Sequence, residues 1–195
     1  MRTARINRKT AETDIELKLA LDGSGESEIK SGSGFMDHML TLFAAHSLCD
    51  LQLNCAGDTD VDFHHSIEDI GIALGEALSA ALGDKAGINR YGSFYLPMDE
   101  ALVFVALDFS GRSYLAYDLG IPTEKIGELD SELIEEFFAA LSRSAGLTLH
   151  ITKIAGKNSH HIAEAAFKGF GRAVRMATFE DSRLNGTIPS TKGVL

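Results

Sequence analysis

A five-residue pattern that suits metal binding, His-His-x-x-Glu, occurs twice in this chain. The copies span residues 64–68 and 160–164 and contain four of the seven histidines. On an α-helix, a Glu three or four positions after a His lies on the same face, so each copy groups three potential ligands. One copy is most simply a chance feature of a helix surface. Two copies indicate two metal-binding half-sites related by an internal duplication.

Adjacent histidines on a helix point about 100° apart, so one helix does not easily direct both at one ion. We therefore expect His64 and His65 to serve different metals, and likewise His160 and His161. Each ion then draws ligands from both halves of the chain or from neighbouring subunits. Metal removal is accordingly predicted to damage assembly as well as activity.

The elements around the two copies follow the same order in both halves of the chain. A short helix, a strand and a long helix are predicted at residues 35–45, 48–55 and 64–82, and again at 134–145, 147–154 and 159–178. The short helices place His38 and Glu136 at equivalent positions, which gives each half-site a fourth ligand. The pattern predicts an α+β fold, an internally duplicated unit with each sheet covered by helices on one side.

Shorter signals complete this prediction. Strands are expected at residues 2–7, 15–21, 101–107 and 112–117. Residues 22–25, Asp-Gly-Ser-Gly, are expected to form a hairpin turn, and Ser159 is expected to cap the last long helix. The chain is interpreted as one domain, residues 1–195, made of two pseudo-repeats of about residues 1–90 and 91–195.

Composition restricts the partners and the compartment. A net charge of −10 and a pI near 5.1 make nucleic acid and anionic membranes poor partners. No run of eighteen apolar residues exists, and the first residues lack the apolar core of a signal peptide. We therefore expect a cytoplasmic protein. Cys49 and Cys55 are expected to be reduced and structural, with a disulfide or metal role as the alternative.

Eight groups are available as ligands, enough for two metals at four protein ligands each. They are His38, His64, His65, Glu68, Glu136, His160, His161 and Glu164. Imidazole with a minority of carboxylate suits Mn, Fe, Zn or Ni. Four protein ligands on an octahedral ion leave two positions open, the arrangement of a catalytic site. A di-metal oxidase or hydrolase and a non-catalytic metal-storage particle are the alternatives from other functional classes.

Cations beside glycines and hydroxyl side chains provide a second signal. The group consists of Arg90, Arg112, Lys168, Ser190, Thr191 and Lys192. In an acidic protein these residues suit a phosphate monoester held by charge-assisted hydrogen bonds, although each alone also fits an ordinary solvated surface. Lys168 is the best placed, because it follows Glu164 by four residues on the same helix face. A lone histidine such as His46 or His150 has a core or surface position as its alternative role.

Six segments spread along the chain form a specific combination. They are residues 35–40 (Phe-Met-Asp-His-Met-Leu), 62–69 (Asp-Phe-His-His-Ser-Ile-Glu-Asp), 97–100 (Pro-Met-Asp-Glu), 108–112 (Asp-Phe-Ser-Gly-Arg), 156–161 (Gly-Lys-Asn-Ser-His-His) and 189–193 (Pro-Ser-Thr-Lys-Gly). With Arg-Lys-Thr-Ala-Glu-Thr at residues 8–13, the chain resembles the imidazoleglycerol-phosphate dehydratase family nearly from end to end. These enzymes are lyases of histidine biosynthesis.

The resemblance implies a ribosomal-S5-domain-2-like fold and a homo-oligomer of twenty-four subunits with sites at subunit interfaces. It implies two Mn²⁺ ions per active site and a small-molecule phosphate substrate, imidazole glycerol phosphate, which loses water to give imidazole acetol phosphate. One ion would take His38, His65, His160 and Glu164, and the other His64, Glu68, Glu136 and His161. Family members commonly have His where this chain has Glu136, but a carboxylate can still bind Mn²⁺.

The predicted mechanism relies on both metals. A substrate ring coordinated through both nitrogens binds as an imidazolate, which is electron-rich enough to expel hydroxide from the adjacent carbon. The diazafulvene-like intermediate loses a proton, and the resulting enol becomes the ketone. One carboxylate must transfer protons: the resemblance indicates Glu12, assisted by Glu68 or Glu164. It also implies that the substrate contacts Glu12, His46, the predicted ligands other than Glu136, and the six phosphate-binding residues.

Overall fold

Alternating apolar and polar residues build two four-stranded sheets in the computed structural model, which describes residues 1–195. The first sheet has the order β1-β2-β4-β3 and contains β1 (Thr3–Lys9), β2 (Thr13–Ala20), β3 (Ser27–Lys30) and β4 (Asp50–Gly57). The second has the order β5-β6-β10-β7 and contains β5 (Tyr91–Met98), β6 (Ala101–Asp108), β7 (Tyr114–Asp118) and β10 (Thr148–Ala155). A two-stranded hairpin, β8 (Lys125–Ile126) and β9 (Leu129–Asp130), lies outside both sheets.

The two sheets correspond strand by strand. In each, two antiparallel strands are followed by a third strand that pairs in parallel with the last one, across a short helix. In each, alternate residues of the second strand are buried, so one face meets the core and the other meets solvent. This repetition confirms the predicted α+β fold with two similar halves. The boundary near residue 90, and the assignment of both halves to one domain, stay predictions.

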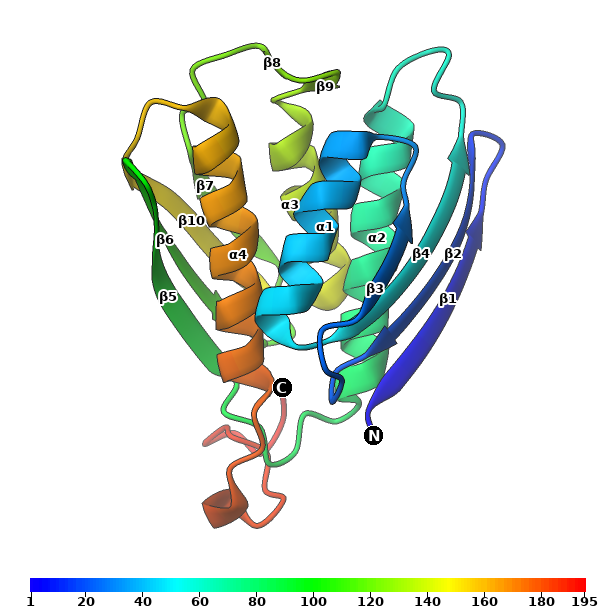
Figure 1. Cartoon of the computed structure of the whole chain (residues 1–195). Helices are drawn as coiled ribbons and strands as arrows, with labels where there is room; N and C mark the ends of the chain where they lie inside the picture. Colours follow the sequence, from blue (N-terminus) through cyan, green and yellow to red (C-terminus); the bar gives the residue numbers. More distant parts are fainter.

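Four helices fill the space between the sheets, as Figure 1 shows. They are α1 (Gly34–Ser47), α2 (His64–Leu82), α3 (Leu133–Ala145) and α4 (Ser159–Thr178). The long helices α2 and α4 each cover the sheet of their own half, whereas the short helices exchange partners: α1 packs against α4, and α3 against α2. One hydrophobic core of 49 buried residues therefore joins both halves.

Glycines allow the exchanged helices to approach closely. A Cβ on Gly75 of α2 would lie 2.6 Å from the carbonyl oxygen of Leu141 in α3. A Cβ on Gly171 of α4 would lie 2.9 Å from the carbonyl oxygen of Phe43 in α1. Backbone thus meets backbone at equivalent crossings in both halves.

Some local predictions were wrong. Residues 22–25 do not form a hairpin, because β4 lies between β2 and β3; instead the Asp50 carboxylate accepts hydrogen bonds from the backbone N–H of Ser24, Gly25 and Glu26 at the start of β4. The cap of α4 is Asn158 rather than Ser159, since its side chain accepts from two backbone N–H groups of the first turn.

Sequence patterns failed to predict other elements or placed their bounds differently. The short β3 and the tyrosine-rich β5 were not predicted, and β7 begins at Tyr114 rather than residue 112. Both cysteines are buried and unpaired, as expected. None of the helices has the length and apolar character that crossing a bilayer requires.

Candidate metal centre

All four helices begin at the same end of the molecule, so the residues near their N-termini are brought together (Figure 1). His38 lies in the second turn of α1, and each His-His pair lies in the first turn of α2 or α4. The exchange of helix partners sets which of these residues meet, because α1 of the first half packs against α4 of the second.

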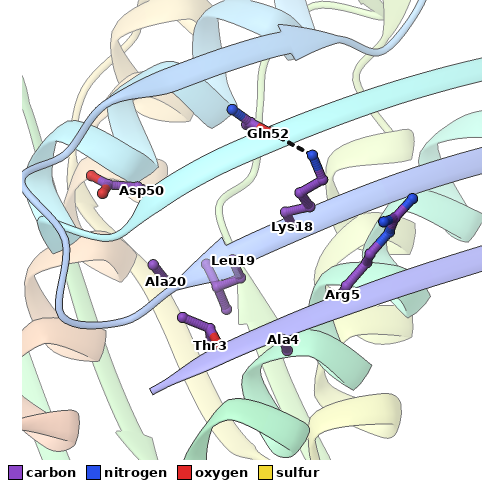
Figure 2. Close-up of a pocket in the computed structure, with 8 residues that line it drawn as sticks. All are labelled: Thr3, Ala4, Arg5, Lys18, Leu19, Ala20, Asp50 and Gln52. Carbon is purple, nitrogen blue, oxygen red and sulfur yellow. Dashed lines mark hydrogen bonds between the residues drawn. The ribbon is translucent and has the colours of Figure 1, made fainter. Parts of the chain in front are cut away.

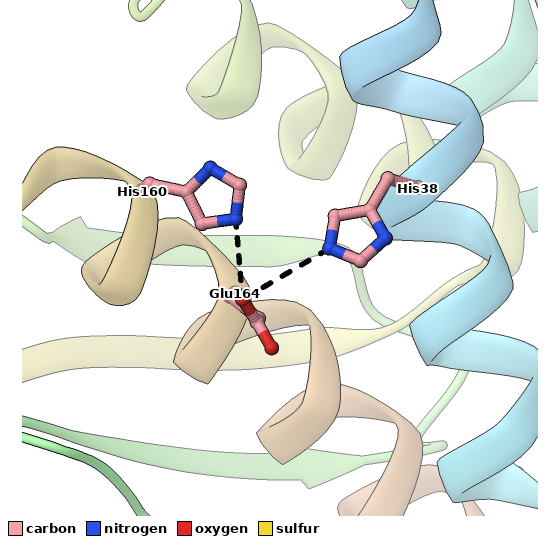
Figure 3. A group of neighbouring side chains, drawn as sticks. All are labelled: His38, His160 and Glu164. Carbon is pink, nitrogen blue, oxygen red and sulfur yellow. Dashed lines mark ion pairs between the residues drawn. The ribbon is translucent and has the colours of Figure 1, made fainter.

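Three potential ligands converge where α1 meets α4, as Figure 3 shows. Glu164 Oε2 lies 3.2 Å from His160 Nε2 and 3.9 Å from His38 Nε2. One ligand atom from each residue lies within 4.8 Å of the other two. Glu164 is buried and His38 is exposed, so the group opens to the surface. Two imidazole nitrogens and one carboxylate oxygen fit a first-row divalent ion such as Mn²⁺.

Lys168 is part of the environment of this cluster. Its ammonium pairs with Oε1 of Glu164, one helical turn away, and leaves Oε2 facing the two histidines. Burial raises the pKa of Glu164, but the hydrogen bond and charge of Lys168 outweigh burial, and the pKa lies below its ordinary value. Glu164 is therefore a carboxylate at neutral pH, as ligation requires.

The second histidine of each pair points elsewhere, as the 100° spacing predicts. His65 Nδ1 lies 3.0 Å from Asp58, and its Nε2 lies 3.7 Å from Glu12. The hydrogen bond with Asp58 raises the pKa of His65. His161 has the same surroundings, with Nδ1 2.7 Å from Glu100, and this hydrogen bond raises its pKa.

The residues of the other predicted ligand set do not come together as closely within one chain. His64, Glu68 and Glu136 lie on the neighbouring helices α2 and α3 but do not form a second close group like that of His38, His160 and Glu164. Glu68 instead accepts a hydrogen bond of 2.9 Å from Arg143 of α3. Within one chain, the structure thus gathers three of the eight predicted ligands.

Most of the predicted phosphate-binding residues lie together at the opposite end of the molecule. Five of the six line a pocket of about 260 Å³: Arg90, Arg112, Ser190, Thr191 and Lys192. Asp108 holds the Arg90 guanidinium at 2.6 Å, which raises the pKa of Arg90, and Arg90 also donates to the carbonyl oxygen of Pro189 in the C-terminal tail. Lys168 is absent from this pocket because it lies beside Glu164.

The pocket and the cluster are far apart in one chain. The backbone N–H of Arg90 binds the carbonyl oxygen of Ala177, near the C-terminal end of α4, whereas Glu164 lies near the beginning of that helix. At 1.5 Å per residue, the two points are separated by roughly 20 Å. A small substrate cannot reach both sites of the same chain.

The two remaining predicted site residues lie in different places. Glu12 is half exposed in the turn between β1 and β2. His46 lies in the last turn of α1, half buried, where burial first and then the charges of Arg172 and Lys168 lower its pKa.

Sequence reasoning missed the partners of the predicted residues. Asp58, Glu100 and Asp108 each bind a predicted site residue but were not assigned a role. The signal for Glu100 was available, since Glu12 directly precedes β2 and Glu100 directly precedes β6. A hollow of about 410 Å³ on the outer face of the first sheet, where Lys18 donates to Gln52 (Figure 2), contains none of the predicted site residues.

Comparisons with known proteins identify the family to which this chain is similar. The family model described as imidazoleglycerol-phosphate dehydratase matches residues 31–174. Imidazoleglycerol-phosphate dehydratases from Synechococcus sp. and Dinoroseobacter shibae are each 57% identical over 195 residues; the alignments cover 100% of this chain and 97% and 100% of those proteins.

Solved structures give the same result. The dehydratase of Staphylococcus aureus is 41% identical with a TM-score of 0.84, over 92% of this chain and 99% of that one. The enzyme of Pyrococcus furiosus is 40% identical with a TM-score of 0.84, over 97% of this chain and 100% of that one. The chain therefore belongs to the imidazoleglycerol-phosphate dehydratase family and is a hydro-lyase.

Proposed function

We propose that this enzyme dehydrates imidazole glycerol phosphate with two Mn²⁺ ions per active site, in sites completed by neighbouring copies of the chain. The observation that carries the proposal is the cluster of His38, His160 and Glu164, built by helices from opposite halves. Mn²⁺ is favoured because a carboxylate stands in each predicted ligand set. When bound, the two ions would supply Lewis-acid stabilisation of negative charge on the substrate ring.

The chain's own residues have separate tasks. His38, His160 and Glu164 would hold one ion together with His65 of a neighbouring copy, and His64, Glu68, Glu136 and His161 would hold the other. Glu12 is proposed to transfer the proton, because its carboxylate is exposed and adjacent to His65. Glu68 and Glu164, as ligands, would assist by fixing the ions, and His46 would line the substrate site.

Phosphate binding is assigned to the pocket of Arg90, Arg112, Ser190, Thr191 and Lys192. Asp108 fixes the guanidinium of Arg90 before any ligand arrives, which lowers the entropy lost on binding. Lys168 would join this group only from another copy, since in its own chain it lies against Glu164.

The separation of roughly 20 Å between pocket and cluster supports shared sites. A substrate with a three-carbon chain between its imidazole and its phosphate needs both groups close together. Two copies of the chain can provide this if the phosphate pocket of one faces the metal cluster of another. This reasoning supports a homo-oligomer, for which the family resemblance implies twenty-four subunits. We also expect a cytoplasmic location, where both cysteines stay reduced.

Mixed particles test the proposal. His38→Ala should lose bound Mn²⁺ and dehydration activity, whereas Lys192→Ala should keep Mn²⁺ and show a strongly raised KM for imidazole glycerol phosphate. When the two variants are co-expressed in equal amounts, about one quarter of the sites combine an intact cluster with an intact pocket, so activity should return to about that fraction. Purified particles are assayed for Mn content and turnover.

His150→Ala is the matched control, because this exposed histidine lies beside Tyr114, with ring centroids 5.8 Å apart, away from the cluster. It should retain metal and activity. Mixed particles as inactive as the two separate variants would refute shared sites. Full turnover by enzyme stripped of all divalent metal would refute the metal-dependent reaction itself.

A further inference from the structure

Glu100 is fixed between a predicted metal ligand and the backbone. Its Oε2 lies 2.7 Å from His161 Nδ1, while Oε1 accepts hydrogen bonds of 2.8 and 3.2 Å from the backbone N–H groups of Asn158 and Lys157. Asn158 is also the N-cap of α4. Glu100 thus ties the β5–β6 turn to the start of the helix that carries His161.

Asp58 has the same relation to His65. Both of its carboxylate oxygens lie near His65 Nδ1, at 3.0 and 3.2 Å. An ionised carboxylate only accepts hydrogen bonds, so Nδ1 of each histidine must carry the hydrogen. Nε2 is the nitrogen left to bind an ion, and it faces Glu12 in one half and Asp99 in the other, at 3.7 and 3.8 Å.

The two halves achieve this with non-equivalent residues. Glu12 and Glu100 occupy the same place in the repeat, immediately before β2 and β6. Asp58 directly follows β4, and the residue that directly follows β10 is Gly156, which has no side chain to contribute. The second half therefore uses Glu100 for the contact that Asp58 makes in the first half, whereas Glu12 lies beside Nε2 of His65 rather than Nδ1.

We propose that Glu100 and Asp58 are positioning residues that hold His161 and His65 as Nδ1–H tautomers and direct their Nε2 atoms at the ions. The inference rests on the proposed function, which makes these histidines ligands. A carboxylate on the second ring nitrogen fixes the orientation of a ligating histidine and raises its basicity, and its removal typically costs about 10- to 100-fold in metal affinity.

Two variants of Glu100 test the inference. Glu100→Ala should weaken one class of Mn²⁺ site by about 10- to 100-fold, measured by chelator competition, whereas Glu100→Gln keeps an acceptor oxygen and should recover much of the affinity. In metal-free protein with ¹⁵N-labelled histidine, Glu100→Ala should also convert His161 from the Nδ1–H form to a mixture of tautomers. Asp58→Ala and Asp58→Asn should do the same for His65.

Asp50→Ala is the control, since it removes a carboxylate that accepts three backbone N–H groups at the start of β4 and contacts no histidine. Asp50→Ala should leave the Mn²⁺ affinity and the histidine tautomers unchanged. A folded Glu100→Ala protein with wild-type affinity and an unchanged His161 tautomer would overturn the positioning role. Full metal content in His161→Ala would instead defeat the ligand assignment of the proposed function, while the tautomer measurement on metal-free protein still decides the positioning role.

Discussion

The first half of the chain, with β1–β4, α1 and α2, and the second half, with β5–β10, α3 and α4, share their framework but differ in their polar groups. Strand order, pairing directions and the close helix crossings at Gly75 and Gly171 are repeated. The buried Asp69 of α2, five residues after His64, corresponds to the buried Ala165 of α4, five residues after His160. Lys168 corresponds in the same way to Ile72.

This difference separates the residues of the repeat that determine the fold from those that determine the chemistry of the site. Close packing between backbones depends on small residues at fixed positions, and Gly75 and Gly171 occupy equivalent positions in the two halves. Charged groups act locally, so each half can change them without altering the fold. The result is one cluster of three potential ligands at the α1–α4 contact and a different arrangement at the α2–α3 contact, where Arg143 donates to Glu68.

The strongest test of this comparison is to replace, one at a time, the two glutamates that precede β2 and β6. Glu12→Gln should lower kcat by about 10²- to 10⁴-fold, the usual contribution of a general acid or base. Glu100→Gln should lower kcat by less than about tenfold, because an amide oxygen can still accept from His161. Both variants are compared at saturating Mn²⁺ and substrate. Equal losses in the two variants would mean that the equivalent positions have not diverged in role.

A second test removes Asp69, a buried charge whose equivalent position in the second half holds Ala165. Asp69 accepts hydrogen bonds of 2.8 Å from Arg8 and 2.5 Å from Thr13, and so holds the turn that carries Glu12 against α2. Asp69→Ala should lower the unfolding free energy by about 2–3 kcal/mol, below the value for a fully buried pair because Arg8 is 30% exposed. Urea denaturation measures the change.

Two companion variants make the Asp69 result decisive. Replacing both partners, as Arg8→Leu with Asp69→Leu, should cost less than Asp69→Ala alone, since no charge is left unpaired. Arg5→Ala breaks the exposed pair with Glu16 on the same sheet and should cost below about 1 kcal/mol. If Asp69→Ala proved as mild as Arg5→Ala, the buried pair would not be what distinguishes the first half.

The framework was largely predictable because it depends on periodicity. The long helices over residues 64–82 and 159–178 were placed correctly, since apolar spacing and flanking turns define them locally. The order of strands in each sheet was not predicted. It depends on the strands that β4 and β10 pair with, and such long-range pairing leaves no local sequence pattern. The absence of a hairpin at residues 22–25 has the same cause.

The site was predictable in its residue types but not in its grouping. Through the family resemblance, the sequence predicted that His38, His160 and Glu164 bind the same ion, and the structure brings these three residues together. It did not reveal that α1 packs against α4 of the other half, which is what makes them neighbours. Asp58 was missed because acidic residues in turns are common, and only its contact with His65 distinguishes it. Glu100 was missed although its place before β6 matches that of Glu12 before β2.

The smallest expected effect concerns the glycines that both halves share. Gly75→Ala and Gly171→Ala would each place a Cβ within 3 Å of a carbonyl oxygen on the exchanged helix, which forces the helices apart. Overpacking of this kind costs about 1–3 kcal/mol, and the higher helix propensity of alanine returns up to about 1 kcal/mol, so we expect a net loss of about 1–2 kcal/mol at each position. Gly34→Ala serves as the control, because its Cβ would meet nothing closer than 3.7 Å.

Since the two crossings are equivalent, chemical denaturation should give similar losses for Gly75→Ala and Gly171→Ala. A loss at only one of them would show that the framework, and not only the chemistry, has diverged between the halves.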